Sequence, residues 1–297
     1  MKLVTYLDNK MERVGVLNSD ETWVYPMRAL GMPYDSMQDV IEKMTRAEKE
    51  LASLYSRREP EEIHGAVPMG QAVLAAPIPR PKQDIICLGI NYMEHAYESA
   101  RYKEEAFGGD RPFAVYFSKR VNEAVPTGGY IEAHTDLVDS LDYECELAVV
   151  ISKDAKNVPE QEVFEYIFGY TIINDVSARN VQTRHKQWYF GKSLDGFTPM
   201  GPCIVTADSI AFPPKLKIQS KVNDELRQDS NTELLIFDVA HVISELSQGM
   251  TLKAGTIISM GTPAGVGMGF VPPRFLKPGD KVECIVEGIG SLVNMVK

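Results

Sequence analysis

The chain has 297 residues, of which 44% are hydrophobic and 24% are charged, the composition of an ordinary globular protein. Its formal net charge of −10 argues against nucleic acid or an anionic membrane as the main partner, because both are bound through clustered Lys and Arg. The four cysteines are far apart and form no CxxC pair, so neither structural zinc nor a disulfide framework is expected. The charged N-terminal segment and the lack of an apolar run near ~18 residues predict a cytoplasmic protein.

Short strands separated by turns are predicted for residues 2–30, where apolar runs alternate with turn residues. Apolar residues then recur at three- and four-residue spacing over 37–55, which predicts one amphipathic helix. The proline-rich segment 76–84 is typical of a domain boundary. We therefore expect a small N-terminal α+β domain at residues 1–78 and a larger domain at 79–297.

The larger domain is predicted to consist mainly of strands. An apolar strand over 84–90 leads into a helix, with Asn91 as its N-cap and Glu94 completing a capping-box pattern. The polar, glycine-containing residues 103–111 are predicted to form a loop. A further helix is expected over 235–249, and the other apolar runs have the lengths and compositions of strands. The expected fold class is α+β, mostly β.

Acidic residues alternate along the segment DYECELAVVI. Asp142, Glu144 and Glu146 would point to one face of a strand, and this strand continues into an apolar run that must enter the core. Carboxylates crowded near a core repel each other and resist desolvation, so they need a compensating partner. The competing interpretation is an exposed strand face with solvated acids, which is the more common role of an arbitrary Glu-x-Glu.

Asp175 supplies a further candidate carboxylate. It follows the apolar run GYTIIN at the end of a predicted strand, where functional sites are often built. The chain offers no His/Cys ligand set, so a bound metal would have oxygen ligands, and three carboxylates with open positions suit Mg²⁺ or Mn²⁺. Glu144, Glu146 and Asp175 are therefore the candidate metal ligands.

His95 and Glu98 are spaced i, i+3 on the helix predicted after Asn91, so their side chains can meet. A carboxylate beside an imidazole orients the ring and raises its basicity, which a general base acting on water requires. The alternative is a surface His–Glu pair, the more common case for an arbitrary His-x-x-Glu. The position between a glycine-ended strand and a loop favours catalysis, because a moving loop could carry the base over a metal.

Lys192 lies in a turn-rich segment, where a cation could pair with a substrate carboxylate or a developing enolate; a solvated loop lysine is the alternative. Thr262 stands where a predicted strand meets the glycine-rich segment GTPAGVGMG. Backbone N–H groups and one hydroxyl in such a loop could hold a carboxylate. The segment is neither GxxxxGK[ST] nor GxGxxG, so it does not indicate nucleotide binding.

Five segments, in this order, resemble the fumarylacetoacetate hydrolase superfamily and together span roughly residues 80–297. They are IICLGINYMEHAYE, DYECELAVVISKDAKNV, FGYTIINDVSARNVQ, GKSLDGFTPMGPCIV and SQGMTLKAGTIISMGTPAGVG. Each segment alone is weakly diagnostic, whereas five in order are specific. Two stretches depart from the family pattern. The approach to the acidic strand reads IEAHTDLVDSL instead of the usual proline-bearing sequence, and residues 99–111 match no single subfamily.

The resemblance implies a mixed β-roll or sandwich catalytic domain behind the small N-terminal domain, assembled as a homodimer. It implies Mg²⁺ or Mn²⁺ held by Glu144, Glu146 and Asp175, and a dyad of His95 and Glu98 carried on a closing lid. The positions that match the family's substrate contacts are Lys192, Arg179, Gln182 and Thr262.

The expected reaction is hydrolysis of a C–C bond in an acylpyruvate-type 2,4-dioxo acid, such as fumarylpyruvate or acetylpyruvate, through a metal-stabilised enolate. His95, held by Glu98, would activate water, and Lys192 would stabilise the enolate charge. The same residues would serve an oxaloacetate decarboxylase, or an isomerase or hydratase of unsaturated 2-oxo diacids. A non-catalytic protein that binds a metal or a 2-oxo acid is the alternative from another class. Hydrolysis ranks first because the dyad is present.

Overall fold

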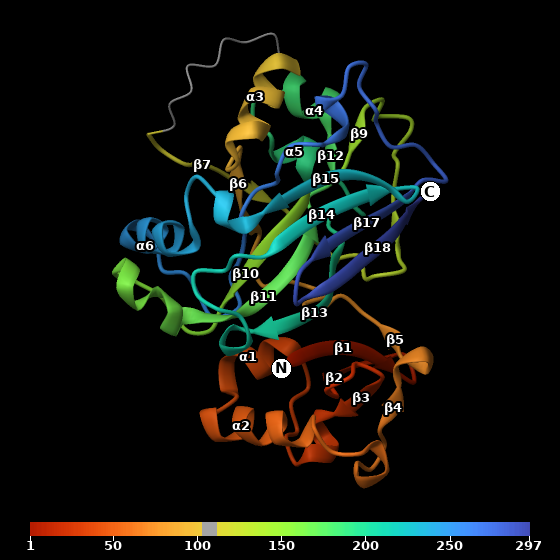
Figure 1. The fold of residues 1–297 in the computed structure, drawn as a ribbon, viewed down its shortest axis with the longest axis vertical. Helices are drawn as coiled ribbons and strands as arrows, with labels where there is room; N and C mark the ends of the chain where they lie inside the picture. Colours follow the sequence, from red (N-terminus) through yellow and green to blue (C-terminus); the bar gives the residue numbers. More distant parts are fainter. Residues whose placement is uncertain (103–111) are drawn as a thin grey trace.

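The computed structural model describes residues 1–102 and 112–297, so the loop predicted at 103–111 lies outside the described residues. Within them the strands form an 11-stranded sheet, a 5-stranded sheet and a two-stranded ribbon, and Figure 1 shows the N-terminal elements as the lower lobe. The strand-rich α+β class expected from the sequence is confirmed. All four cysteines are buried and free, and no helix in the described part is long and apolar enough to span a membrane.

Three strands within residues 2–30 correspond to the predicted ones, and together with two short strands that were not predicted they add to the large sheet. Asn9 and Lys10 form the turn of the first hairpin with positive φ at both positions, as the twist of a tight hairpin requires. The first strand also pairs antiparallel with a strand of the upper lobe, with Leu3 opposite Ile204. The division at 78/79 stays a proposal, since hydrogen bonds cross it. The strands are β1 (Lys2–Asp8), β2 (Met11–Leu17), β3 (Trp23–Pro26), β4 (Val67–Pro68) and β5 (Val73–Leu74).

The single helix predicted for residues 37–55 is wrong, because the structure has two, α1 (Met37–Lys43) and α2 (Arg46–Tyr55). Met44 is extended, with ψ 119, and Thr45 begins the second helix. The Thr45 side chain accepts from the backbone of Glu48, whose carboxylate accepts from the backbone of Thr45, a complete capping box. Because this capping box starts a new helix at Thr45, the segment forms two helices, although apolar residues recur at helical spacing across both.

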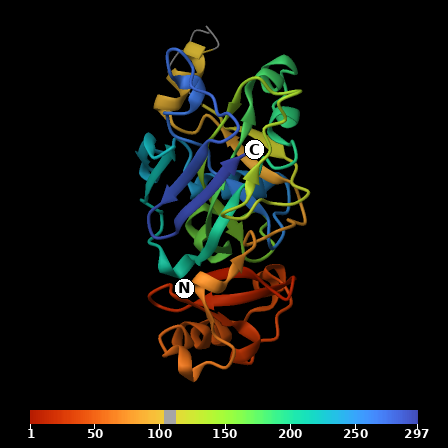
Figure 2. The same ribbon diagram turned by 90° about the vertical axis from the view of Figure 1, so that its right-hand side faces the viewer.

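The upper lobe packs the two larger sheets against each other, and the main core lies between them (Figures 1 and 2). In the large sheet, β10 and β11 are buried along their whole length, which explains their nearly continuous apolar sequences. The strands that continue this sheet are β13 (Met200–Thr206), β11 (Ile167–Asn174), β10 (Cys145–Ile151), β16 (Ile257–Ser259), β6 (Ile85–Gly89) and β7 (Val115–Lys119). The second sheet contains β15 (Glu225–Asn231), β14 (Lys217–Val222), β17 (Lys281–Val286), β18 (Gly290–Val296) and β8 (Tyr130–Ile131).

The remaining elements connect these strands, and several gather at the upper end of the molecule in Figure 1. The ribbon pairs β9 (Leu141–Asp142) with β12 (Ser177–Ala178). The helices are α3 (Met93–Tyr102), α4 (Arg179–Arg184), α5 (Tyr189–Lys192) and α6 (Val239–Gly249). Short 3₁₀ turns cover Met27–Leu30, Pro60–Glu62, Met69–Gln71, Glu160–Tyr166, Ala207–Ser209, Thr232–Leu234 and Gly267–Gly269.

Asn91 does not cap α3, contrary to the sequence prediction. Its buried side chain accepts from Phe237 N at 2.9 Å and donates to Phe237 O at 3.0 Å and to Met260 O at 2.8 Å. The helix begins at Met93 instead. Asn91 thus joins the start of α3 to the end of β16 and to the segment before α6.

We expect Asn91→Ala to lower the free energy of unfolding by about 2 kcal/mol or more, because it leaves three backbone groups without their partner. Chemical denaturation of both proteins measures the difference. Asn122→Ala is the matched control, since Asn122 is exposed and its side chain contacts Asp195 at the surface; its effect should stay within about 0.5 kcal/mol. Equal losses in the two variants would contradict this role for Asn91.

Candidate active site

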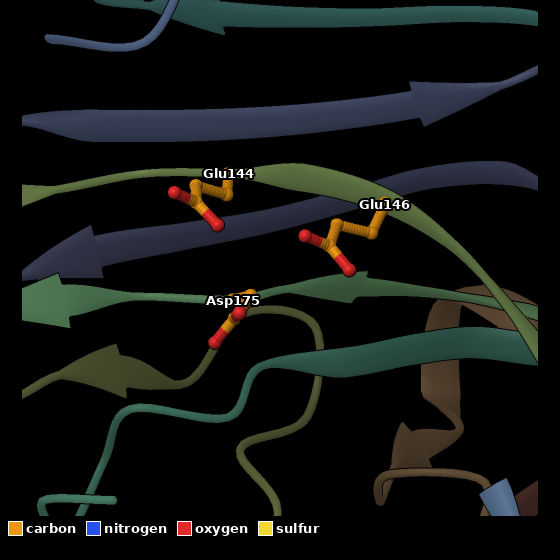
Figure 3. A group of neighbouring side chains, drawn as sticks. All are labelled: Glu144, Glu146 and Asp175. Atoms are coloured by element: carbon orange, nitrogen blue, oxygen red, sulfur yellow. The ribbon is translucent and has the colours of Figure 1, made fainter. Parts of the chain in front are cut away.

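Three carboxylates meet where β10 and β11 lie side by side. Glu144 directly precedes β10, Glu146 is the second residue of this strand, and Asp175 follows the last residue of β11, so the antiparallel register brings them together. Candidate ligand oxygens of all three lie within 4.8 Å of one another, and Figure 3 shows their carboxylates converging. The three residues are at most 5% exposed. The interpretation of this strand as a solvated acidic face is therefore wrong.

Cationic side chains compensate this buried negative charge. Lys192 Nζ lies 2.7 Å from Glu144 Oε2 and 2.7 Å from Asp175 Oδ2, and it is 2% exposed, so the alternative of a solvated loop lysine is also wrong. Lys119, which the sequence analysis missed, lies 2.8 Å from Asp175 Oδ1. It also donates to the carbonyls of Val176 and Lys192. In the sequence, the one indication of this role is the position of Lys119 directly after the strand residues VYFS.

The charges of this cluster change the acidity of its members. Burial alone would raise the pKa of Glu144, but the charges of Lys192 and Arg179 outweigh it and hold this pKa well below its usual range. Burial, together with the negative charges of Asp175 and Glu144, raises the pKa of Glu146 well above its ordinary value. Among the described residues, Glu146 is the member of the cluster that forms no ion pair, whereas Glu144 and Asp175 each contact cationic side chains.

A divalent cation fits this donor set. Glu146 accepts from Ser259 Oγ at 2.5 Å and from Gly261 N at 3.0 Å, both at Oε2, and in the described part of the chain its Oε1 has no hydrogen-bond donor. A divalent ion would supply the charge that keeps Glu146 ionised, and oxygen donors suit Mg²⁺ and Mn²⁺. The residues that would hold it are Glu144, Glu146 and Asp175.

The predicted dyad is formed, and it faces the same cavity as the carboxylates. His95 Nδ1 lies 3.1 Å from Glu98 Oε2 on α3, and His95 is 4% exposed, so the alternative of a surface pair is wrong. A carboxylate at Nδ1 favours a proton on that nitrogen and leaves Nε2 as the basic atom. Glu98 is held in turn by the backbone N–H of Gly265, at 2.9 Å from Oε1.

Arg179 is committed to protein carboxylates. Its Nε lies 2.9 Å from Asp142 Oδ2 and its Nη2 lies 2.6 Å from Glu144 Oε1, while Nη1 donates to Gln182 Oε1 at 3.1 Å. Asp142 belongs to β9 and stands outside the metal-ligand cluster, although it alternates with Glu144 and Glu146 in the sequence. The Asp142–Arg179 pair is the feature that spacing alone did not reveal.

Thr262 is fixed by the strands beside it. Its hydroxyl donates to Cys145 O at 2.9 Å and accepts from Gln228 Nε2 at 2.7 Å. Gln228 also accepts from Cys145 N at 3.1 Å, so one buried amide aligns Thr262 with the strand that carries the glutamates. Gln228 lies on β15, a strand that the sequence analysis did not predict.

These groups surround one cavity of about 740 Å³. Asp175 and Glu98 are not among the lining residues, but each contacts one that is: Asp175 contacts Lys192, and Glu98 contacts His95. Aromatic and apolar side chains form other parts of its wall, among them Phe117. The candidate residues that line the cavity are His95, Glu144, Glu146, Arg179, Gln182, Lys192 and Thr262. The cavity thus brings together a carboxylate cluster that could hold a divalent cation, a histidine oriented by a carboxylate, and two cationic side chains paired with the acidic residues.

The family described as fumarylacetoacetate (FAA) hydrolase, C-terminal, matches residues 84–297. The chain belongs to the fumarylacetoacetate hydrolase family. Within the family it is 44% identical over 228 residues to oxaloacetate tautomerase YisK of Bacillus subtilis, an alignment that covers 77% of this chain and 74% of that protein. The five ordered motifs that resembled this family are thereby confirmed as evidence of membership.

Solved structures of family members share the fold. A fumarylacetoacetate hydrolase from Exiguobacterium antarcticum is 37% identical, with a TM-score of 0.85 over 100% of this chain and 99% of that one. A maleylpyruvate hydrolase from Sphingobium sp. SYK-6, solved with manganese(II) and pyruvate, is 26% identical, with a TM-score of 0.77 over 100% and 98% of the two chains. Relatives in this family are therefore enzymes of more than one reaction type.

Excess Mn²⁺ or Mg²⁺ should raise the melting temperature of the protein, because an ion bound to the folded state alone stabilises it by ~2.7 kcal/mol at 100 times its dissociation constant. Glu146→Gln should remove this response with little loss of stability in the absence of metal, since it deletes a buried charge that has no positive partner. Glu61→Gln, at an exposed position, is the control and should keep the full response. Thermal unfolding with and without metal makes the comparison, and a response retained by Glu146→Gln would exclude Glu146 as a ligand.

Proposed function

We propose that this protein is a divalent-metal-dependent enzyme that moves a proton at C3 of a short 2-oxo dicarboxylate, interconverting the enol and keto forms of an oxaloacetate-like substrate. The observation that carries the proposal is the His95–Glu98 dyad, which shares one cavity with the carboxylate cluster. The 44% identity to an oxaloacetate tautomerase supports the substrate class.

The chain's own residues divide into a binding set and a proton-transfer set. Glu144, Glu146 and Asp175 would hold the metal, which when bound would act as a Lewis acid toward the 2-oxo group. Lys192 and Thr262 would orient the substrate from the cavity wall. The two carboxylates that contact Lys192 hold its ammonium group in place at the cavity wall, so it would interact with developing negative charge without rearrangement.

His95 would transfer the proton. In the keto-to-enol direction its Nε2 accepts a proton from C3, the electron pair of the C–H bond becomes the C2–C3 double bond, and the 2-oxo oxygen takes up the negative charge and then a proton from solvent. The reverse sequence yields the keto form. Glu98 stabilises the imidazolium that forms in between, because its carboxylate contacts Nδ1.

Hydrolysis of a C–C bond in an acylpyruvate is the second candidate, and the sequence analysis ranked it first. The cavity favours it, because about 740 Å³ lies within the ~300–1,000 Å³ typical of drug-sized ligands and exceeds the need of a four-carbon acid. The similarity to a maleylpyruvate hydrolase also supports hydrolysis as the function. His95 would then take its proton from water, and the hydroxide would attack the distal carbonyl.

One assay series separates these reactions. The metal-supplemented protein is given oxaloacetate, acetylpyruvate and fumarylpyruvate in D₂O, and NMR follows deuterium at C3, released pyruvate and released carbon dioxide. Faster tautomer interconversion than in a blank of buffer and metal, with oxaloacetate left intact, supports the tautomerase. If the acylpyruvates are cleaved and tautomer interconversion is no faster than in the blank, the tautomerase proposal is wrong and the protein is a hydrolase. Release of carbon dioxide from oxaloacetate would indicate a decarboxylase.

His95→Ala should lower the catalysed rate by about 10²–10⁴-fold, because it removes the general base, while the thermal response to metal remains. Initial rates at saturating substrate and metal titrations followed by thermal unfolding provide the two measurements. His64→Ala changes an exposed histidine far from the cavity lining and should leave both quantities unchanged. An unaltered rate in His95→Ala would remove this residue from the mechanism.

A further inference from the structure

The segment 265–269, called here the Glu98-binding loop, lies directly against the helix that carries the dyad. Gly265 N donates to Glu98 Oε1 at 2.9 Å, and Gly269 O accepts from the guanidinium of Arg101, one turn further along α3. Tyr102 at the end of α3 meets Phe275 edge to face at 6.4 Å between ring centroids. Three contacts within the last turns of α3 therefore hold this helix to the segment 265–275.

The loop has room for Glu98 because position 269 carries no side chain, and its backbone path beside Arg227 requires glycine at position 265. A Cβ on Gly269 would lie 1.8 Å from Glu98 Oε1 and 2.0 Å from Glu98 Cδ, far inside any possible contact. Gly265 has φ +103, which favours glycine, and a Cβ there would lie 2.0 Å from Arg227 O. The carboxylate of Glu98 thus occupies the space that a side chain at position 269 would take.

Asp142 holds the same loop from its other side. Its carboxylate accepts from Gly267 N at 2.6 Å and from Met268 N at 3.0 Å. The carboxylate also binds Arg179, which in turn binds Glu144. A continuous series of contacts thereby runs from Glu144 through the Arg179–Asp142 ion pair to the Glu98-binding loop. From the loop it continues through Glu98 to His95.

We propose that the Glu98-binding loop sets the position of the general base relative to the metal-ligand cluster, with Gly269, Gly265 and Asp142 as positioning residues. This inference rests on the proposed role of the dyad. Glu98 uses one oxygen to orient His95 and the other to bind the loop, so a displaced loop displaces the imidazole as well. None of the three positioning residues is needed to hold the metal itself.

The test is Gly269→Ala, compared with wild type and with Gly249→Ala. Gly249 is exposed, and a Cβ there meets nothing within 4 Å. Gly269→Ala should lower kcat by about 10²-fold, the cost of a misplacement near 1 Å, with the metal-induced rise in melting temperature retained. Hydrogen–deuterium exchange of the α3 amides should become faster in this variant and not in Gly249→Ala.

A second background separates positioning from a general structural role. Glu98→Ala removes every Glu98 atom that a Cβ on Gly269 would strike, so Gly269→Ala added to Glu98→Ala should change kcat by less than about threefold and leave α3 exchange as in Glu98→Ala alone. Equal losses in both backgrounds, or α3 exchange unchanged by Gly269→Ala, would overturn the proposal. The exchange measurement needs no substrate, so it decides the role of the loop even if the wild type fails the oxaloacetate assay.

Discussion

Carboxylates with almost no contact with solvent lie at the ends of β9, β10 and β11, and the upper lobe is arranged around the positive charge that they require. Lys119 comes from β7, Lys192 from α5 and Arg179 from α4, so one cluster fixes elements far apart in the sequence. Removing one partner of such a buried group is far more costly than removing a surface pair. Counting Asp142 with the three candidate metal ligands, the described residues contribute four buried carboxylates and three buried cations to this region, which leaves one carboxylate, Glu146, without an ion pair.

This imbalance links binding to catalysis. A site that lacks positive charge attracts a cation, and a bound divalent ion would turn the same region into a receptor for an anionic 2-oxo acid. The overall charge of −10 is compatible with an acidic substrate for this reason, since the field at the cavity differs from that of the whole surface. His95 and Glu98, the proposed proton-transfer groups, lie on α3 outside the carboxylate cluster, so substitutions there would leave the proposed metal ligands in place.

Local patterns in the sequence predicted the parts of the site that are local in structure. Period-two spacing placed Glu144 and Glu146 together, and i, i+3 spacing placed His95 beside Glu98. The analysis of local patterns missed the break between α1 and α2, although Thr45 and Glu48 have the spacing of a capping box in the sequence. The longer strands were predicted from apolar runs or from alternating apolar residues, except β15 (ELRQDSN), which has few apolar residues.

Local sequence patterns did not predict the contacts between segments that are far apart in the chain. Nothing near Asp142 in the sequence indicates that it binds Arg179 and two backbone amides more than 120 residues away. Asn91 was assigned a local capping role, whereas its partners lie on segments about 150 residues further along the chain. A side chain that satisfies buried backbone groups depends on which strands become neighbours, and topology decides this rather than spacing.

The pairing of β1 with β13 has a consequence for solubility. In its absence β13 would be an edge strand, with unpaired N–H and C=O groups beside the apolar side chains of Cys203, Ile204 and Val205. Edges of this kind recruit strands from other molecules. A shortened polypeptide that starts at residue 84, where the family match begins, would expose this template and self-associate. The N-terminal segment thus shields the enzyme-like core from aggregation.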